Sequence, residues 1–120
     1  MSARLSLPVR GIVLASVLFA ASAAQAIGPV GDAEAGKAAS VVCQACHGTD
    51  GNGIGDPQYP LLAGQYPDYL AKALRDYKSG ARDNAIMLGF ASTLSDSDID
   101  NLAAWFASQP SKLRDLKGED

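Results

Sequence analysis

The amino-acid sequence predicts an all-α domain in which three main helices are joined by long loops. Residues 67–79 and 95–109 repeat apolar side chains at the three- and four-residue spacing of a helix, and residues 33–42 are rich in alanine. No segment keeps up the alternation of polar and apolar residues that is typical of a β-strand. The intervening stretches are rich in glycine and proline, as loops are. Long loops in so small a domain need something to pack on.

The N-terminal 26 residues have the pattern of a secretory signal peptide. Two arginines and no acid lead into an uncharged, largely apolar run at residues 11–24, which is short for a bilayer span. The run leads into the sequence AQA, a small-x-small site for a signal peptidase, so we expect cleavage after Ala26. An uncleaved anchor is the alternative. We therefore expect residues 1–26 to be a signal peptide and residues 27–120 to form one domain in the periplasm, with no membrane span.

The charge of the mature chain disfavours nucleic acid as a partner. Loss of the two N-terminal arginines would leave eight basic residues of ten against thirteen acidic ones, a formal charge of −5. A polyanionic partner would be repelled by that excess of acid. A domain of this size gains much from a disulfide, a metal or a cofactor at its centre.

Capping signals place the three helices. Asp32 is expected to cap a helix through residues 33–42 that reaches a cluster of cysteines and carries an unusual internal glycine. Pro67 begins the second helix at a first-turn position, and Gly80 lies where a C-cap is expected. The third begins in the SDSD sequence at 95–98, which resembles a capping box. Residues 81–93, with the apolar stretch NAIMLGF, are interpreted as an extended loop.

Cys43, Cys46 and His47 form the pattern Cys-x-x-Cys-His, which is the attachment pattern of c-type haem. Two thiols three residues apart can reach the two vinyl groups on one edge of a porphyrin. The next residue then projects an imidazole under the iron. An export signal agrees with this interpretation, since the attachment is made outside the cytoplasm. The sequence therefore predicts one covalently bound haem c.

Three other interpretations of the cluster fit the sequence less well. A thioredoxin-like redox pair needs a βαβ scaffold, and no strand pattern is present. A structural zinc site needs four ligands, and the sequence has no third cysteine and no second histidine. A plain disulfide is possible in an oxidising compartment, but it leaves His47 and the glycine-rich loop after it unexplained.

The number of histidines limits which residue can be the second axial ligand of the iron. His47 is the only histidine, so two-histidine ligation within the chain is impossible. The sixth ligand is a methionine, a weaker group or nothing. Met87 is the one methionine outside the signal peptide, forty residues beyond His47. The alternative is that Met87 simply fills the core.

Four stretches of the chain resemble a bacterial class I cytochrome c, close to single-haem units of the cytochrome c4 and c553 type. They are CQACHGTDGNG, YPLLAGQYPDYLAKALRDYKSGAR, NAIM and LSDSDIDNLAAWFASQ, and the likeness covers about Asp32 to Gln109. The resemblance implies the class I cytochrome c fold wrapped around one haem. Because cytochrome c4 proper has two such units in tandem, this chain corresponds to half of it at most.

The resemblance also implies roles for individual residues. Cys43 and Cys46 would form the thioethers, and His47 and Met87 would be the axial ligands of the iron. The carbonyl of Pro60 would accept the other N–H of the His47 imidazole and fix the ring. Further implied features are a crossing of the first and last helices at Gly36 and Trp105, an uncertain helix contact at the small Ala39, and candidate hydrogen bonds from Tyr59, Tyr66, Arg82 and Asn84.

The basic residues of the second helix are interpreted as a solvated face rather than a docking patch. Asp68 and Asp76 interrupt the set, and Asp68 and Lys72 form an expected i,i+4 pair. The members of this set are Lys72, Arg75, Lys78 and Arg82.

These features together predict a periplasmic one-electron carrier that is not an enzyme. Its partners are redox proteins whose identity the sequence does not give. One alternative is the cytochrome subunit of a larger dehydrogenase. Another, from a different class, is an enzyme or sensor whose haem binds a small ligand at an open sixth site.

Overall fold

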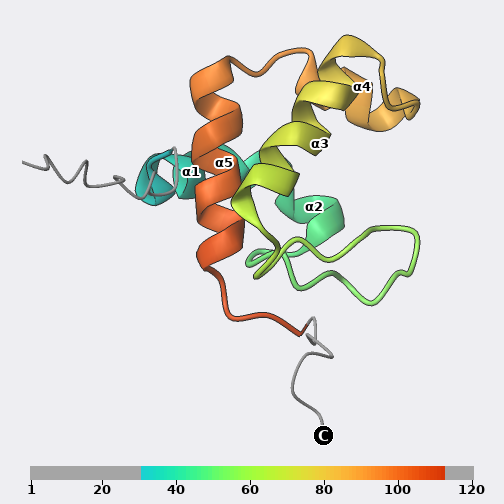
Figure 1. Ribbon diagram of the computed structural model, residues 1–120. Helices are drawn as coiled ribbons and strands as arrows, with labels where there is room; N and C mark the ends of the chain where they lie inside the picture. The colour runs from blue at the N-terminus through green and yellow to red at the C-terminus, as the bar shows by residue number, and fades with distance from the viewer. Residues whose placement is uncertain (1–30, 113–120) are drawn as a thin grey trace, which may run out of the picture.

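The computed structural model describes residues 31–112, and this part of the chain is helical without a strand. The expected signal peptide at residues 1–26 lies outside the described residues. The helices are drawn in Figure 1, and their bounds are α1 Ala33–Ala39, the 3₁₀ helix η1 Ser40–Val42, α2 Gln44–His47, α3 Pro67–Ser79, α4 Ala85–Ala91 and α5 Asp96–Ser108. The predicted all-α class is confirmed.

The first and last helices cross in close contact, as predicted at Gly36. A Cβ atom on Gly36 would lie 1.9 Å from the carbonyl oxygen of Asn101 and 2.8 Å from the Cβ of Trp105. Only a glycine therefore lets α1 approach the backbone of α5 this closely. The side chain of Asn101 also accepts a hydrogen bond of 2.7 Å from the Asp32 N–H, which joins the start of α1 to α5. Figure 1 shows α5 running across α1.

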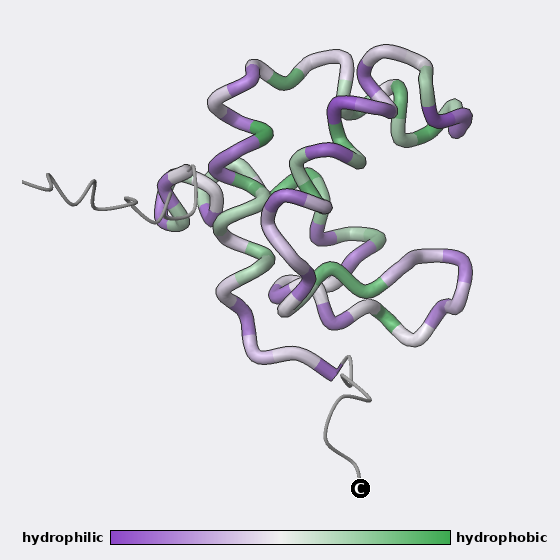
Figure 2. Tube along the Cα trace, viewed as in Figure 1, coloured by the Kyte–Doolittle hydropathy of each residue, from purple (hydrophilic) through white to green (hydrophobic). Residues whose placement is uncertain are grey.

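The core lies where α3 packs against α5. Its buried members are Leu70, Ala71, Ile99, Leu102, Ala103 and Phe106. Leu102, Ala103 and Phe106 come from one apolar face of α5, as the spacing predicts. Figure 2 shows apolar residues alternating with polar ones along α5.

The caps of the longer helices follow the predicted chemistry. Gly80 ends α3 in the left-handed conformation with a φ of 79°, and Pro67 begins it. At the start of α5, Ser95 accepts a hydrogen bond from the backbone of Asp98, and the Asp98 carboxylate accepts one from the Ser95 N–H. This reciprocal pair is a capping box. Asp32 caps α1 by accepting from the N–H groups of Glu34 and Ala35.

Two expectations about the helices are wrong. The first helix does not run unbroken to residue 42, because α1 ends at Ala39 and tightens into η1. The stretch NAIMLGF is not an extended loop, since it holds helix α4. Asn84 supplies the missing start signal: its side-chain oxygen accepts a hydrogen bond of 3.0 Å from the Met87 N–H.

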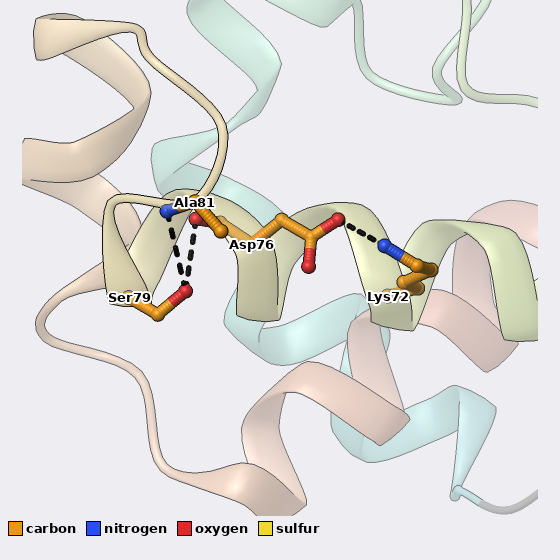
Figure 3. Close-up of polar contacts among 4 residues, drawn as sticks. All are labelled: Lys72, Asp76, Ser79 and Ala81. Atoms are coloured by element: carbon orange, nitrogen blue, oxygen red, sulfur yellow. Dashed lines mark hydrogen bonds and ion pairs between the residues drawn. The ribbon is translucent and has the colours of Figure 1, made fainter.

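The basic residues of α3 are all engaged within the molecule. Lys72 pairs with Asp76, one turn towards the C-terminus, so the expected Asp68–Lys72 pair is wrong. Figure 3 shows this pair together with the bond from Ser79 to the backbone of Asp76. Arg75 pairs with Asp100 at 2.7 Å. These contacts agree with a solvated face better than with a free docking patch.

Lys78 and Arg82, at the end of the same set, are also engaged. The Lys78 ammonium donates to the carbonyl of Leu94 at 2.5 Å. The Arg82 guanidinium lies 4.8 Å from the centre of the Tyr77 ring.

Candidate functional site

The cysteine cluster begins directly after η1 and ends with α2. Cys43 is the residue between the two helical turns, and Cys46 and His47 are the last residues of α2. The helical turn places Cys43 and His47 one turn apart, and the His47 N–H donates to the Cys43 carbonyl at 3.0 Å. Cys43 and Cys46 are not joined to each other by a disulfide. Burial raises the pKa of the Cys43 thiol above its usual value.

The imidazole of His47 is buried and held by the loop that follows it. Its Nδ1–H donates to the carbonyl oxygen of Pro60 at 2.8 Å. With Nδ1 occupied in this way, Nε2 is the nitrogen that can bind a metal. The ring is 7% exposed, so it reaches the interior and not the solvent.

The glycine-rich loop that follows His47 in the sequence is hydrogen-bonded to its backbone. We call residues 48–53 the glycine loop. The N–H of Gly53 donates to the His47 carbonyl at 2.8 Å, and the Gly51 carbonyl accepts from Leu62 at 2.7 Å. Gly51 has a φ of 82°, and a Cβ there would lie 2.8 Å from the ring of Phe106. The loop therefore needs glycine at this position, both for its backbone conformation and for its approach to α5.

Met87 comes from the opposite side of the molecule, on α4. Figure 1 shows α4 beyond α3, away from the glycine loop. α4 begins at Asn84, whose side chain caps the N–H of Met87 itself. The methionine therefore lies in the first turn of a short capped helix, and its backbone position depends on that cap.

One cavity of about 250 Å³ brings the predicted residues together. Cys43, Cys46, His47, Pro60 and Met87 all line it. The rest of its wall is mostly apolar and includes Leu61, Leu62, Leu70, Ala73, Leu74, Phe90, Leu102, Ala103 and Phe106. A flat, largely apolar group with a metal at its centre fits these residues, because they offer two thiols, an oriented imidazole nitrogen and a thioether sulfur around an apolar space.

The predicted polar neighbours divide into two groups. Tyr59, Arg82 and Asn84 line the cavity, whereas Tyr66 is not among its lining residues and is 68% exposed. The ring of Tyr59 meets that of His47 edge-on, with the ring centres 6.4 Å apart. The side chain of Asn84 accepts a hydrogen bond from the Met87 N–H, and its backbone carbonyl accepts one from the Leu88 N–H.

No group of three or more His, Cys, Asp or Glu side chains that could hold a metal ion occurs in residues 31–112. Within the same residues, no helix has the length and apolar character needed to cross a membrane.

Comparisons with known proteins agree with this geometry. A family model described as Cytochrome c matches residues 33–110. The chain is 51% identical over 79 residues to cytochrome c4 of Pseudomonas aeruginosa, covering 66% of this chain and 39% of that protein. It is 42% identical over 72 residues to the thiosulfate dehydrogenase electron acceptor of Stutzerimonas stutzeri, covering 60% and 33%. The crystal structure of reduced recombinant cytochrome c4 from Pseudomonas stutzeri matches with a TM-score of 0.65 and 43% identity, covering 69% of this chain and 48% of that one.

The chain belongs to the cytochrome c family, and its helices have the class I architecture of that family. Membership implies covalently bound haem c. Within the family the chain is similar to cytochrome c4, which confirms the predicted resemblance. It spans about half the length of these relatives, between 39% and 50% of the first two cytochrome c4 chains.

The predicted hydrogen bond from Asn84 to the methionine segment is present, but its role as the cap of α4 was not predicted, although an Asn directly before an apolar run is a helix-capping signal. Sequence reasoning missed Asn52. Its partners lie 58 and 60 positions along the chain, so no local signal could have indicated it.

Proposed function

We propose that the chain is a periplasmic one-electron carrier with a single haem c. The observation that carries this proposal is the apolar cavity in which Cys43, Cys46, His47 and Met87 meet. Haem iron, when bound there, supplies the redox change between Fe(III) and Fe(II). The same proposal makes residues 1–26 an export signal and residues 27–120 one domain.

Each residue of the cavity has a distinct part in this proposal. The Cys43 and Cys46 sulfurs tie the group covalently to the helix that ends at His47. The Pro60 carbonyl orients the His47 ring and raises the basicity of its free nitrogen. Met87 provides a neutral sulfur, which favours Fe(II) and raises the potential relative to two imidazoles.

The apolar wall acts in the same direction, because low polarity disfavours the extra charge of Fe(III). This wall also keeps water from the group. His47 is the single histidine of the sequence, and it is already used as a ligand. The site therefore supports electron transfer better than peroxide chemistry, which needs a distal acid–base group.

The similarity to a thiosulfate dehydrogenase electron acceptor supports a second possibility for the partner. In that case the chain works as the cytochrome component of a larger dehydrogenase. Purification at native abundance separates the two, since a free carrier elutes alone and a subunit elutes with a larger chain that bears another cofactor.

Covalent attachment is the first test of the proposal. The exported protein is denatured and extracted with acidic organic solvent, and the colour is expected to stay with the polypeptide. If the colour leaves with the solvent, the thioethers do not exist and the proposal fails.

Substitution of Met87 is the second test. Met87→Ala is expected to lower the reduction potential and to let the reduced protein bind carbon monoxide rapidly, because the sixth position opens. Leu88→Ala is the matched control, since Leu88 is the next residue of α4 but does not line the cavity. Rapid binding of carbon monoxide by the unsubstituted protein would favour the ligand-binding alternative.

A further inference from the structure

After α5 ends, the chain lies against the glycine loop. We call residues 110–112 the C-terminal segment. Asn52, on the glycine loop, holds this segment with both ends of its side-chain amide. Its Nδ2 donates to the Pro110 carbonyl at 2.8 Å, and its Oδ1 accepts from the Lys112 N–H at 2.9 Å. The amide thus pairs with backbone groups two residues apart, as a neighbouring strand would.

The orientation of Asn52 is itself fixed. The Asp50 carboxylate accepts from the Asn52 backbone N–H and from its Nδ2, both at 2.9 Å. Nδ2 therefore uses its two hydrogens, one for Asp50 and one for Pro110, and the side-chain amide has a defined direction. An amide with a partner for each hydrogen is held in place rather than merely solvated.

A second contact holds the segment to the chain that leaves the glycine loop. The Ser111 hydroxyl donates to the Ala63 carbonyl at 2.5 Å. A Cβ on Gly64 would lie 2.4 Å from the Cβ of Ser111, so the two backbones approach closely. The C-terminal segment is therefore attached to the glycine loop through Asn52 and to the chain after that loop at Ala63.

The two neighbours of Asn52 in the glycine loop make the hydrogen bonds that hold His47 and the chain after the loop. Gly53, the next residue, donates its N–H to the His47 carbonyl at 2.8 Å. Gly51, the residue before, accepts at its carbonyl from Leu62 at 2.7 Å and from Ala63 at 3.1 Å. The C-terminal segment is thus connected through Asn52 to the loop that supports His47.

We infer that Asn52 is a positioning residue that couples the C-terminal segment to the glycine loop behind His47. Displacing residues 110–112 loosens the His47 side of the cavity, and holding them keeps it closed. Whatever is joined to the chain beyond Lys112, or docks there, therefore acts on the loop that supports His47. This inference concerns the polypeptide alone and does not depend on the identity of the redox partner.

Amide hydrogen exchange of the purified full-length holoprotein tests the coupling. The reporters are the N–H groups of Gly53, Leu62 and Ala63, whose acceptors lie in or next to the loop. Asn52→Ala removes both bonds to the segment and is expected to speed exchange of the reporters about tenfold or more. The N–H of Leu70, in α3, is expected to exchange as in the unsubstituted protein.

Lys112→Pro tests the coupling from the C-terminal segment, because proline has no N–H to donate to the Asn52 Oδ1. The substitution changes no atom of the glycine loop. It is expected to speed the same reporters, and the double variant is expected to be no faster than Asn52→Ala. Lys112→Ala keeps the N–H and is the matched control. If Asn52→Ala does not fold, Lys112→Pro decides by itself.

Asn101→Ala controls for a general loss of stability. Asn101 also joins two distant parts of the chain, since its side chain accepts from the Asp32 N–H, but it lies on α5 away from the loop. The inference is supported if the reporters exchange faster in Asn52→Ala and in Lys112→Pro while the N–H of Leu70 does not. The reporters must also be unchanged in the controls Lys112→Ala and Asn101→Ala. Unchanged reporters in either variant, or equal acceleration of all amides including those of α3, overturns it.

Discussion

The two walls of the cavity are built in different ways. On the His47 side, the backbone is fixed by hydrogen bonds from Gly53 to His47 and from Leu62 to Gly51, and the imidazole is fixed by Pro60. On the Met87 side, the wall is the short helix α4, which packs on α3 and begins at a single capping side chain.

The glycines show the same contrast. A Cβ on Gly51 would lie 2.9 Å from the backbone nitrogen of Ala63, whereas a Cβ on Gly89, in α4, would meet nothing within 4 Å. The histidine side is therefore tightly packed, and the methionine side has room to adjust.

Under the proposed function, this difference indicates which of the two axial ligands can vary. A histidine held by a backbone carbonyl and a crowded loop keeps its orientation when its surroundings change. A methionine in the first turn of a seven-residue helix depends on whether that helix is formed. Under the proposed function, the Met87 side is where the potential and the access of external ligands are most easily altered.

The largest expected effect comes from adding one methyl group to each wall. Gly51→Ala places a side chain at a φ of 82° and against the Phe106 ring, and it is expected to cost about 3 kcal/mol or more of unfolding free energy. Gly89→Ala is expected to gain about 0.5–1 kcal/mol, because an open helical site favours alanine. Urea unfolding of both variants measures the difference. Equal stabilities would show that the walls do not differ in packing.

Removing the cap of α4 is expected to have the next largest effect. Asn84→Ala deletes the acceptor for the Met87 N–H and is expected to cost about 1 kcal/mol, which opens the helix about fivefold more often. The reduced holoprotein should then bind carbon monoxide several times faster. Asn84→Asp keeps the acceptor and should bind at close to the original rate. An unchanged rate in Asn84→Ala would mean that packing on α3 alone holds Met87.

A lower pH is expected to have a smaller effect on stability. It acts through Asp50, in the glycine loop on the His47 side of the cavity. Hydrogen bonds from the Asn52 side chain and backbone lower the pKa of Asp50 below its usual value. Because this pKa is lower in the folded chain, the stabilisation is complete above the unfolded value of about 4 and is lost as the pH falls through the folded value. Asp50→Asn lacks this contribution, so its urea midpoint should fall less between pH 6 and pH 3. Identical pH dependence in the two proteins would contradict this assignment.

The smallest effect is expected on the outer face of α3, away from both walls. Lys72 pairs with Asp76, but its side chain is 73% exposed, so Lys72→Ala is expected to change the unfolding free energy by about 0.5 kcal/mol or less. Thermal unfolding at low and high salt measures it. A loss of more than about 1 kcal/mol would mean that the pair supports the cavity through α3.

Much of the fold could be predicted because its signals are local. Pro67 and Gly80 bound α3, and Ser95 with Asp98 forms the capping box of α5. The cluster from Cys43 to His47 carries its chemistry in its spacing. The Pro60 role came from the family resemblance, and the hydrogen bond to His47 is present in the structure.

The parts that could not be predicted depend on contacts between distant residues or on weak local signals. α4 is seven residues long and contains Gly89, so its apolar run has too few turns to show a helical period. Lys72 has acids four residues away on both sides, and only the structure shows that it pairs with Asp76. The hydrogen bonds of Asn52 to Pro110 and Lys112 require α5 to be in place before the partners meet.

The crossing of α1 and α5 also sets the order of events as the chain is made. Asp32 and Asn101 are 69 positions apart, so α1 must wait for most of the domain to be synthesised before its partner exists. At ordinary rates of synthesis this delay is on the order of several seconds. Cys43 and Cys46 lie between the two helices in sequence and have no finished core around them during that time. The crossing therefore forms only after α5 is present, and until then the core around the two cysteines stays incomplete.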